Sequence, residues 1–397
     1  MLTPAEADAA IAAALAPVPA EIVRLQACAG RILRSPLHAE RDAPPFDRVA
    51  MDGVAIRFGD GSRRRFRIAG VQPAGSPALS LASADDCFEV MTGAVLPRGC
   101  DTVIPVEDLR VGDGHAELLG DRQPAPGRHV HRRGSDARAG DLLLQAGTRL
   151  AAPEIAVAAS SGLAELPVSR LPRIAVISTG DELVEPGGPI LDHQVRRSNS
   201  HGLAAALTLA GFPPASDLQL ADRADVIQSA LGAALRGHDV LVLSGGVSAG
   251  RFDFVPGALA ALGVRARFHG IAQRPGRPMW FGTSASGAAV FALPGNPVSV
   301  LVCLARYVIP ALGRLVGAPE RPPRTAVLAR EFRFDKALTC FLPVKLGYDQ
   351  QGRTIAEPRP THGSGDFIAL AGTDGFVELP PGPATHAAGL VVSFHRW

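Results

Sequence analysis

The sequence predicts a multidomain chain that combines one parallel α/β domain with two all-β regions. Its 397 residues are enough for two to four domains. Glycine (43 residues) and proline (34 residues) are frequent, which indicates many turns and several small domains, although their share stays below that of low-complexity chains. In residues 171–317 a strand, a glycine-rich turn and a helix recur three times, which is the pattern of a doubly wound parallel sheet.

The amino-terminal region predicts a helix followed by an extended segment. Thr3 precedes an apolar run and has Glu6 three residues later, which is typical of a helix capping box. Residues 19–40 form a short mixed segment. A strand in residues 140–150 and a helix in residues 153–161 are expected to return the chain to this segment, so the residues between form an insertion.

Residues 41–137 predict a small β-rich domain. Short runs of strand-forming residues are separated by glycine and proline, which favours strands joined by tight turns. The clearest strands are expected at residues 65–71, 86–91 and 101–106. From about residue 318 onward, strand patterns alternate with glycine turns again and predict a compact all-β terminal domain.

The α/β region contains three short apolar runs, at residues 173–179, 239–243 and 289–293. Continuous runs of this length predict strands that are buried on both faces of a parallel sheet. The helices between them are expected at residues 199–209 and 222–235. Ligands bind such sheets at the carboxyl ends of the strands, so the loops there should carry the function.

Helix caps are predicted at three places in this region. Asn199 or Ser200 is expected to cap the first helix and Asp222 the second, because these side chains accept bonds from first-turn N–H groups. A third helix is expected to have Asn296 as its cap and Pro297 as its first residue.

The loop after residues 239–243 has the composition of a phosphate-binding turn. It contains Gly245, Gly246 and Ser248 ahead of Asp253. It lacks the lysine of a Walker loop and the G-x-G-x-x-G pattern, so a phosphate cradle and an ordinary tight turn both stay open. Asp253 also has two interpretations, as a Mg²⁺ ligand or as a helix cap.

Two further loops suit an anionic ligand. Arg274 and Arg277 flank a Pro-Gly turn and can hold an oxyanion from two sides, although they can equally be ordinary surface arginines. Pro294, Asn296 and Pro297 form a turn whose following helix points backbone N–H groups at the ligand.

Carboxylates are expected to face this ligand. Glu182 and Asp222 follow other strands of the same sheet and, with Asp253, predict a Mg²⁺ site beside phosphate groups. Helix capping is the alternative role for each of the three.

Composition excludes several classes of protein. The net charge of +2 argues against nucleic-acid binding by bulk electrostatics. Five scattered cysteines without C-x-x-C spacing predict reduced thiols rather than disulfides or a zinc site. The acidic amino terminus is unlike a signal peptide, and no uncharged apolar run approaches about 20 residues, so a cytoplasmic protein without a membrane span is expected.

A series of motifs stands in order along nearly the whole chain. They are Pro45-Phe46-Asp47, Ala50-Met51-Asp52-Gly53, Met91-Thr92-Gly93-Ala94, Arg132-Arg133-Gly134-Ser135-Asp136, Ser178-Thr179-Gly180-Asp181-Glu182-Leu183, Ser244-Gly245-Gly246-Val247-Ser248, Pro275-Gly276-Arg277-Pro278, Leu293-Pro294-Gly295-Asn296-Pro297-Val298-Ser299 and Gly363-Ser364-Gly365. In these motifs the chain resembles the molybdopterin molybdenumtransferases of the MoeA and gephyrin E-domain family.

The resemblance implies both fold and activity. The domains would be an elongated linker domain (1–40 and 138–170), an inserted β-rich domain (41–137), an α/β molybdopterin-binding domain (171–317) and a β-barrel (318–397). The implied reaction is a Mg²⁺-dependent insertion of molybdate into adenylylated molybdopterin, which releases AMP. The family resemblance further implies a homodimer with its active site between the subunits.

The resemblance also implies roles for individual residues. The catalytic residues would be Asp52, Thr92, Asp136, Glu182 and Asp253, and the metal ligands Glu182, Asp222 and Asp253. The substrate-binding residues would be Gly245, Gly246, Ser248, Arg274, Arg277, Pro294, Asn296, Pro297 and Ser364.

Several positions depart from the family pattern. Lysines are usual where this chain has Gly270, Arg274 and Arg277, and a Gly-Arg-x-x-Phe-x-Arg motif is usual where residues 336–343 stand. Asn-Ser and Tyr are usual at Arg48-Val49 and Val54. The loss of the lysine at Gly270 and of the two motif arginines favours one alternative to the enzyme, a non-catalytic carrier of a pterin nucleotide. An interaction scaffold is a third hypothesis, which nothing in the sequence supports directly.

Overall fold

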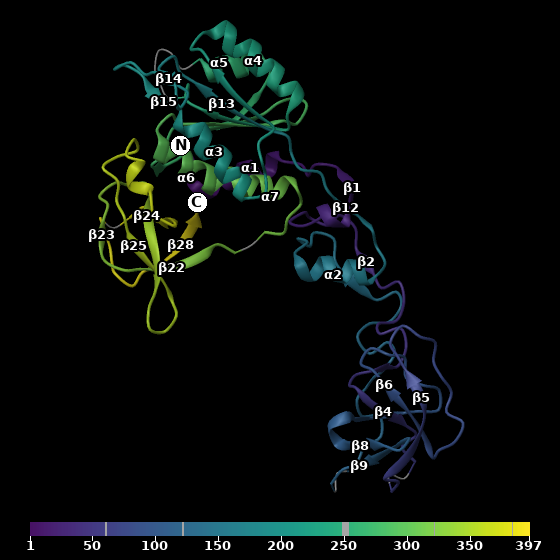
Figure 1. Cartoon of the computed structure of the whole chain (residues 1–397). Helices are drawn as coiled ribbons and strands as arrows, with labels where there is room; N and C mark the ends of the chain where they lie inside the picture. Colours follow the sequence, from purple (N-terminus) through teal and green to yellow (C-terminus); the bar gives the residue numbers. More distant parts are fainter. Residues whose placement is uncertain (60–61, 121–122, 248–253, 321, 383) are drawn as a thin grey trace.

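The computed structural model describes residues 1–59, 62–120, 123–247, 254–320, 322–382 and 384–397. The molecule is elongated (Figure 1). At one end the α/β sheet lies against the carboxy-terminal barrel, and the inserted β-rich region lies at the other end. A narrow linker that the chain crosses twice connects the two ends. The multidomain fold class expected from the sequence is confirmed.

The α/β domain is built on a six-stranded sheet. Its strand order is β16 (Ser216–Leu220), β13 (Ile174–Thr179), β17 (Val240–Ser244), β21 (Ala289–Leu293), β20 (Trp280–Thr283) and β18 (Arg265–His269). The first four strands are parallel, and they include the three strands from which the sequence predicts a parallel sheet. At the other edge β20 runs antiparallel to β21, and β18 runs antiparallel to β20. Only residues 284–288 join β20 to β21, and so short a connection permits only an antiparallel pair.

Helices cover both faces of this sheet. One face carries α1 (Pro4–Ala14), α3 (Ser198–Leu209), α6 (Pro297–Cys303) and α7 (Ile309–Leu315), and the other carries α4 (Ala224–Gly237) and α5 (Val255–Ala261). Alternate strand residues enter the two cores: Ile174 and Val176 pack on the first face, Ala175 and Ile177 on the second. Burial on both faces explains the continuous apolar runs of the sequence.

The predicted start of α1 is confirmed. The Thr3 hydroxyl accepts a hydrogen bond from the Glu6 N–H (3.3 Å), and the Glu6 carboxylate accepts one from the Thr3 N–H (2.7 Å). Gly211 follows the end of α3 in a left-handed conformation, as expected for the residue that closes a helix.

The caps predicted for α3 and α4 are wrong. Arg197 is the cap residue of α3 and Arg223 that of α4, and neither makes a capping bond with its side chain. Asn199 and Ser200 therefore lie inside the first turn of α3, and Asp222 lies just before the cap of α4. The side chains of Asn199 and Asp222 line a cavity instead.

The linker consists of two short antiparallel pairs and one helix. β1 (Ala20–Arg24) pairs with β12 (Glu165–Ser169), and β2 (Leu37–His38) pairs with β11 (Leu142–Leu144). The expected strand and helix are present as β11 and α2 (Ala152–Ser160). Buried residues from both crossings, including Leu33 and Leu166, form a separate small core.

The inserted region contains a six-stranded sheet with the order β7 (Thr102–Pro105), β4 (Gly53–Ile56), β6 (Asp86–Val90), β5 (Arg65–Gln72), β9 (His115–Leu118) and β8 (Leu109–Gly112). The three strands predicted there are present within one residue at each end. A separate antiparallel pair is formed by β3 (Arg48–Val49), which precedes the strands of this sheet in the sequence, and β10 (Val130–His131), which follows them. The expected domain boundaries stay a proposal.

The carboxy-terminal region contains a closed five-stranded barrel. Its strands follow the order β24 (Thr339–Tyr348), β25 (Thr354–Pro358), β22 (Arg324–Leu328), β28 (Val391–Arg396) and β26 (Gly375–Leu379), and β26 pairs with β24 to close the ring. β19 (Gln273–Arg274), which belongs to the α/β part of the chain, adds to the edge of β24. Backbone pairing thus joins the two domains.

Arg306 lies in the helical segment between Pro297 and Leu315, at the place where this segment meets α1 and the barrel. Its guanidinium contacts Asp8 of α1 (2.9 Å) and Glu378 of β26 (2.8 Å), and Glu378 also pairs with His395 of β28 (3.1 Å). Only 12% of the Arg306 side chain is exposed. Burial opposes ionisation of Glu378, but the bonds from His395 and Arg306 outweigh it and hold the pKa of this carboxyl below its ordinary value.

The segment from Pro297 to Leu315 is helical throughout: α6 passes into α7 through a π-helical turn at Leu304–Val308. Within the described ranges it is the one helix long and apolar enough to cross a membrane, with 19 residues and a mean hydropathy of 1.6. Because 67% of it is buried, packed between the sheet and the barrel, it has the properties of a core helix.

Arg306→Met should destabilise the protein, because it leaves the half-buried Glu378 carboxylate without the guanidinium of Arg306. We expect the free energy of unfolding to fall by about 3 kcal/mol, measured by urea unfolding followed by tryptophan fluorescence. Arg330→Met is the matched control, since it breaks the exposed Arg330–Glu357 pair of the same barrel and should cost at most about 1 kcal/mol. Equal losses in the two variants would contradict a special role for Arg306.

Candidate active site

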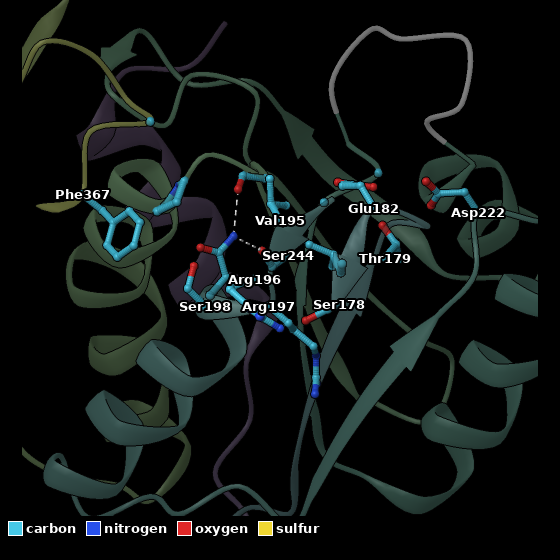
Figure 2. A pocket seen from close by; sticks show the side chains of 17 residues that line it. Ser178, Thr179, Glu182, Val195, Arg196, Arg197, Ser198, Asp222, Ser244 and Phe367 are labelled. Atoms are coloured by element: carbon cyan, nitrogen blue, oxygen red, sulfur yellow. Dashed lines mark hydrogen bonds between the residues drawn. The ribbon is translucent and has the colours of Figure 1, made fainter. Parts of the chain in front are cut away.

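A cavity of about 620 Å³ opens at the carboxyl ends of β13 and β17 and at the start of α6 (Figure 2). This is the edge of the sheet where the sequence predicts a ligand. The residues that line it are Ser178, Thr179, Glu182, Leu183, Val195, Arg196, Arg197, Ser198, Asn199, Asp222, Ser244, Gly245, Gly246, Gly295, Pro297, Gly365 and Phe367.

Gly245 and Gly246 allow the end of β17 to approach its neighbours closely. A Cβ atom on Gly245 would lie 2.9 Å from the Thr179 carbonyl oxygen, and one on Gly246 would lie 2.7 Å from a methyl group of Val255. Both glycines have positive φ (98° and 70°). The Gly245 N–H donates to the Leu293 carbonyl (3.2 Å), so at this residue the tight-turn interpretation is the better one.

Polar groups that sequence reasoning missed form the floor of the cavity. The Asn199 side-chain amide donates to the Ser244 hydroxyl (2.9 Å) and to the Gly295 carbonyl (2.7 Å), which ties α3 to the ends of two strands. The Ser178 side chain is 1% exposed, and its hydroxyl has no hydrogen-bond partner. A buried hydroxyl without a partner is costly, so this atom is suited to bind a ligand or a water molecule.

Carboxylates occupy one end of the cavity. Figure 2 shows Glu182 and Asp222 on the same side, and the Asp222 N–H is held by the Asp181 carboxylate (3.2 Å). Asp253 and Ser248, which the sequence also assigned to this site, lie outside the described residues. Within those residues no group of three His, Cys, Asp or Glu side chains could hold a metal ion.

Mg²⁺ fits this end only if the substrate supplies ligands. Magnesium is usually bound by one or two carboxylates together with phosphate oxygens and water, rather than by a complete protein cage. Glu182 and Asp222 meet that requirement, and the expected three-carboxylate set depends on Asp253.

Arg197 is a further residue that sequence reasoning missed. It is 6% exposed and pairs with Glu185 and Asp217, and Glu185 also contacts His201 (3.3 Å). The hydrogen bond from Arg197 is the main reason that the pKa of Glu185 is lowered. These contacts hold the β14 (Leu183–Val184) and β15 (Val195–Arg196) pair over the cavity. The only feature of the sequence that marked Arg197 was its position just before the predicted helix.

A second cavity, of about 600 Å³, lies between the α/β domain and the barrel. Of the predicted substrate-binding residues it is lined by Arg274, Arg277, Pro294, Asn296 and Ser364. Arg274 and Arg277, which the sequence suggested for the same anionic ligand as the glycine-rich loop, therefore line a different cavity from Gly245 and Gly246. The two arginines turn toward the barrel because β19 pairs with β24 there. Lys336 and His362 add cationic or titratable groups to the same cavity.

The remaining predicted residues lie on the inserted region. The Asp52 carboxylate accepts hydrogen bonds from the Thr92 N–H (2.6 Å) and hydroxyl (2.8 Å), in that order the main reasons that its pKa is lowered. The Asp136 carboxylate contacts His131 (2.7 Å), which lowers its pKa, and Arg48 approaches the other ring nitrogen of His131 (2.9 Å). All three predicted side chains are exposed.

These residues are remote from both cavities within one chain. Neither cavity is lined by any described residue of 41–137, and the inserted region lies at the opposite end of the molecule (Figure 1). The structure therefore brings Glu182, Asp222, Gly245, Gly246 and Pro297 together, but it does not bring Asp52, Thr92 or Asp136 to them.

Family models match most of the chain in the same order as its domains. Residues 2–162 match the MoeA N-terminal region (domain I and II), residues 175–314 a probable molybdopterin binding domain, and residues 325–397 the MoeA C-terminal region (domain IV). The chain belongs to the MoeA family. The resemblance recognised in the sequence motifs is thereby confirmed.

Several members of the MoeA family are similar to this chain over most of their length. A molybdopterin molybdenumtransferase of Synechocystis is 43% identical over 371 residues, which cover 93% of each chain. Molybdopterin molybdenumtransferase 2 of Mycobacterium tuberculosis is 35% identical and covers 92% of each chain. The crystal structure of the molybdopterin biosynthesis moeA protein of Pyrococcus horikoshii OT3 superposes with a TM-score of 0.83, at 26% identity and complete coverage of both chains.

Thr92→Val should raise the pKa of Asp52 without restoring its ordinary value. The substitution removes the hydroxyl donor but keeps the backbone N–H, which lowers the pKa more. A lowered pKa keeps the carboxylate charged further into acid, so the titration midpoint should move up in the variant. It can be measured by NMR titration of the carboxyl carbon. Thr92→Ser keeps a hydroxyl and should leave the midpoint in place; an unchanged midpoint in Thr92→Val would contradict the observed bond.

Proposed function

We propose that this MoeA family member inserts molybdate into adenylylated molybdopterin and releases AMP. The chain is a transferase of molybdenum cofactor biosynthesis, as its named relatives are. The observation that carries the finer proposal is the pair of adjacent cavities. One has carboxylates at its end, and the other has arginines and a lysine.

The carboxylate end suits the phosphoanhydride of the substrate. We infer that Glu182 and Asp222 hold Mg²⁺ together with phosphate oxygens, and Asp253 is proposed as a third ligand. A bound Mg²⁺ would neutralise charge that builds up on the phosphate oxygens. The buried Ser178 hydroxyl, which lines this cavity without a hydrogen-bond partner, would position the substrate.

The second cavity suits the oxyanion. Arg274 and Arg277 present guanidinium groups, which bind tetrahedral oxyanions through several N–H donors at once. The stretch 336–343, where the arginines of the usual family motif are absent, contributes Lys336 to the lining. We propose that these cations hold molybdate in this chain, with the Ser364 segment as the facing wall.

A homodimer would complete the site. Asp52 with Thr92, and Asp136 with His131, form two hydrogen-bonded pairs that reach neither cavity of their own chain. We propose that they act at the first cavity of a second copy, as the family resemblance implies. Asp52 and Asp136 are charged at neutral pH, as aspartates with lowered pKa values must be, and this charge suits contact with a cationic or metal-bound substrate.

We also propose a cytoplasmic location. All five cysteines are free and buried, which fits a reducing compartment.

The reaction is tested by AMP release from adenylylated molybdopterin in the presence of molybdate and Mg²⁺. Glu182→Gln and Asp222→Asn should each reduce release by about 100-fold, because the phosphate oxygens lose their charge-neutralising partner. Asp225→Asn is the matched control: this exposed carboxylate lies near the same helix start but pairs with Arg223 and does not line the cavity. It should keep nearly full activity.

Each other outcome counts against a named part of the proposal. Full release in the presence of a chelator would contradict the Mg²⁺ dependence. Tight binding of the pterin nucleotide without AMP release by the unmodified protein would favour the carrier hypothesis, which the departures from the family motifs support.

Mixing two inactive variants tests the shared site. Asp136→Asn and Asp222→Asn alter different ends of the molecule, so a mixed dimer would contain one site with both residues intact. Random mixing should restore about a quarter of the unmodified activity. No recovery, with mixed dimers demonstrated by native mass spectrometry, would contradict a site built by two subunits.

A further inference from the structure

Phe367 is a large aromatic side chain that is left exposed at the rim of the first cavity. It follows Gly365 in the segment between β25 and β26, and 42% of it is exposed. Figure 2 shows its ring at one end of the cavity, with Glu182 and Asp222 at the other. Packing within the chain therefore leaves much of this ring uncovered.

The backbone around Phe367 is held in place on both sides. The Ser364 carbonyl accepts a hydrogen bond from the Val298 N–H (3.0 Å) at the start of α6. The Phe367 carbonyl accepts one from the Leu370 N–H (2.9 Å), and the Leu370 side chain is buried in the core between barrel and helix. The exposed ring is thus presented by an anchored turn.

The two ends of the cavity match the two ends of one kind of ligand. A phosphate group belongs near the carboxylates, where Mg²⁺ can be shared, and a flat heteroaromatic ring belongs against the aromatic side chain. Stacking on the face of an aromatic side chain is a common way in which proteins bind such rings. Leu183, Val195 and Pro297 supply further apolar lining.

The neighbouring cavity decides which ring lies there. The two cavities share a wall: Gly295 and Gly365 line the first, and Asn296 and Ser364 line the second. The ring end of the first cavity therefore adjoins the cationic cavity proposed for molybdate. In adenylylated molybdopterin the sulfur atoms that accept molybdenum are attached next to the pterin, not next to the adenine.

We propose that Phe367 stacks on the pterin ring of the substrate and so places its sulfur atoms beside the second cavity. This inference rests on the proposed function. It assigns Phe367 as a substrate-binding residue, contributed by the carboxy-terminal region to a cavity of the α/β domain.

Binding measurements with two separate probes test the stacking. Calorimetry on the full-length protein would give Kd for molybdopterin and for AMP. Phe367→Ala should raise Kd for molybdopterin about tenfold and leave Kd for AMP unchanged, whereas Phe367→Trp should retain molybdopterin binding. In the AMP-release assay Phe367→Ala should raise KM, because stacking is lost, and should also lower kcat, because the sulfur atoms are no longer held beside the second cavity.

Ile368→Ala is the matched control. Ile368 is 78% exposed in the same turn and does not line either cavity, so this variant should bind molybdopterin normally. An equal loss in Ile368→Ala would overturn the proposal in favour of an interface or turn defect. Weaker AMP binding in Phe367→Ala, with molybdopterin unaffected, would also overturn it, since the ring would then be adenine.

The stacking and the reaction fail in different ways. Molybdopterin binding that depends on Phe367, without AMP release by the unmodified protein, supports the stacking and counts against the proposed reaction. AMP release at a KM that Phe367→Ala leaves unchanged supports the reaction and overturns the stacking.

Discussion

The orientation of the barrel against the α/β sheet is the constraint on which both cavities depend. Each cavity takes part of its lining from the segment between β25 and β26, so a different tilt of the barrel would change both. Arg306 restricts this tilt, because its half-buried partners Asp8 and Glu378 lie on two separate elements. A buried ion pair adds little net stability over apolar packing. However, the charged groups of such a pair meet only when the elements that carry them are correctly oriented. The contribution of Arg306 here is therefore mainly to geometry.

The strands of the α/β sheet were predictable, whereas two helix caps were not. β13, β17 and β21 are buried on both faces and leave continuous apolar runs in the sequence. Capping residues are also the residues that bind ligands, and the sequence does not distinguish these uses. The sequence predicts a cap at Asn199 and either a cap or a metal ligand at Asp222, and both side chains line the first cavity. The antiparallel β20 and β18 were missed because their pairing depends on a short turn.

The types of residue in the candidate site were predictable from the sequence, but their distribution over two cavities was not. The carboxylates and glycines at the sheet edge follow from strand order alone. Arg274 and Arg277 lie in a second cavity because a two-residue strand pairs with the barrel, which is a tertiary event without a local signal. Ser178 and Phe367 could not be singled out either, since one is notable for an unpaired buried hydroxyl and the other for an uncovered ring.

The double crossing of the linker has a mechanical consequence. The β1–β12 and β2–β11 pairs bind two antiparallel strands into one ribbon, which resists torsion about its long axis more than a single connecting strand would. Bending across the ribbon faces less resistance. In the proposed homodimer, such a ribbon would let the inserted region move toward and away from the partner's cavity while Asp52 and Asp136 keep the same side facing it. A connection that bends but does not twist would keep Asp52 and Asp136 in the same orientation while the substrate enters and the product leaves.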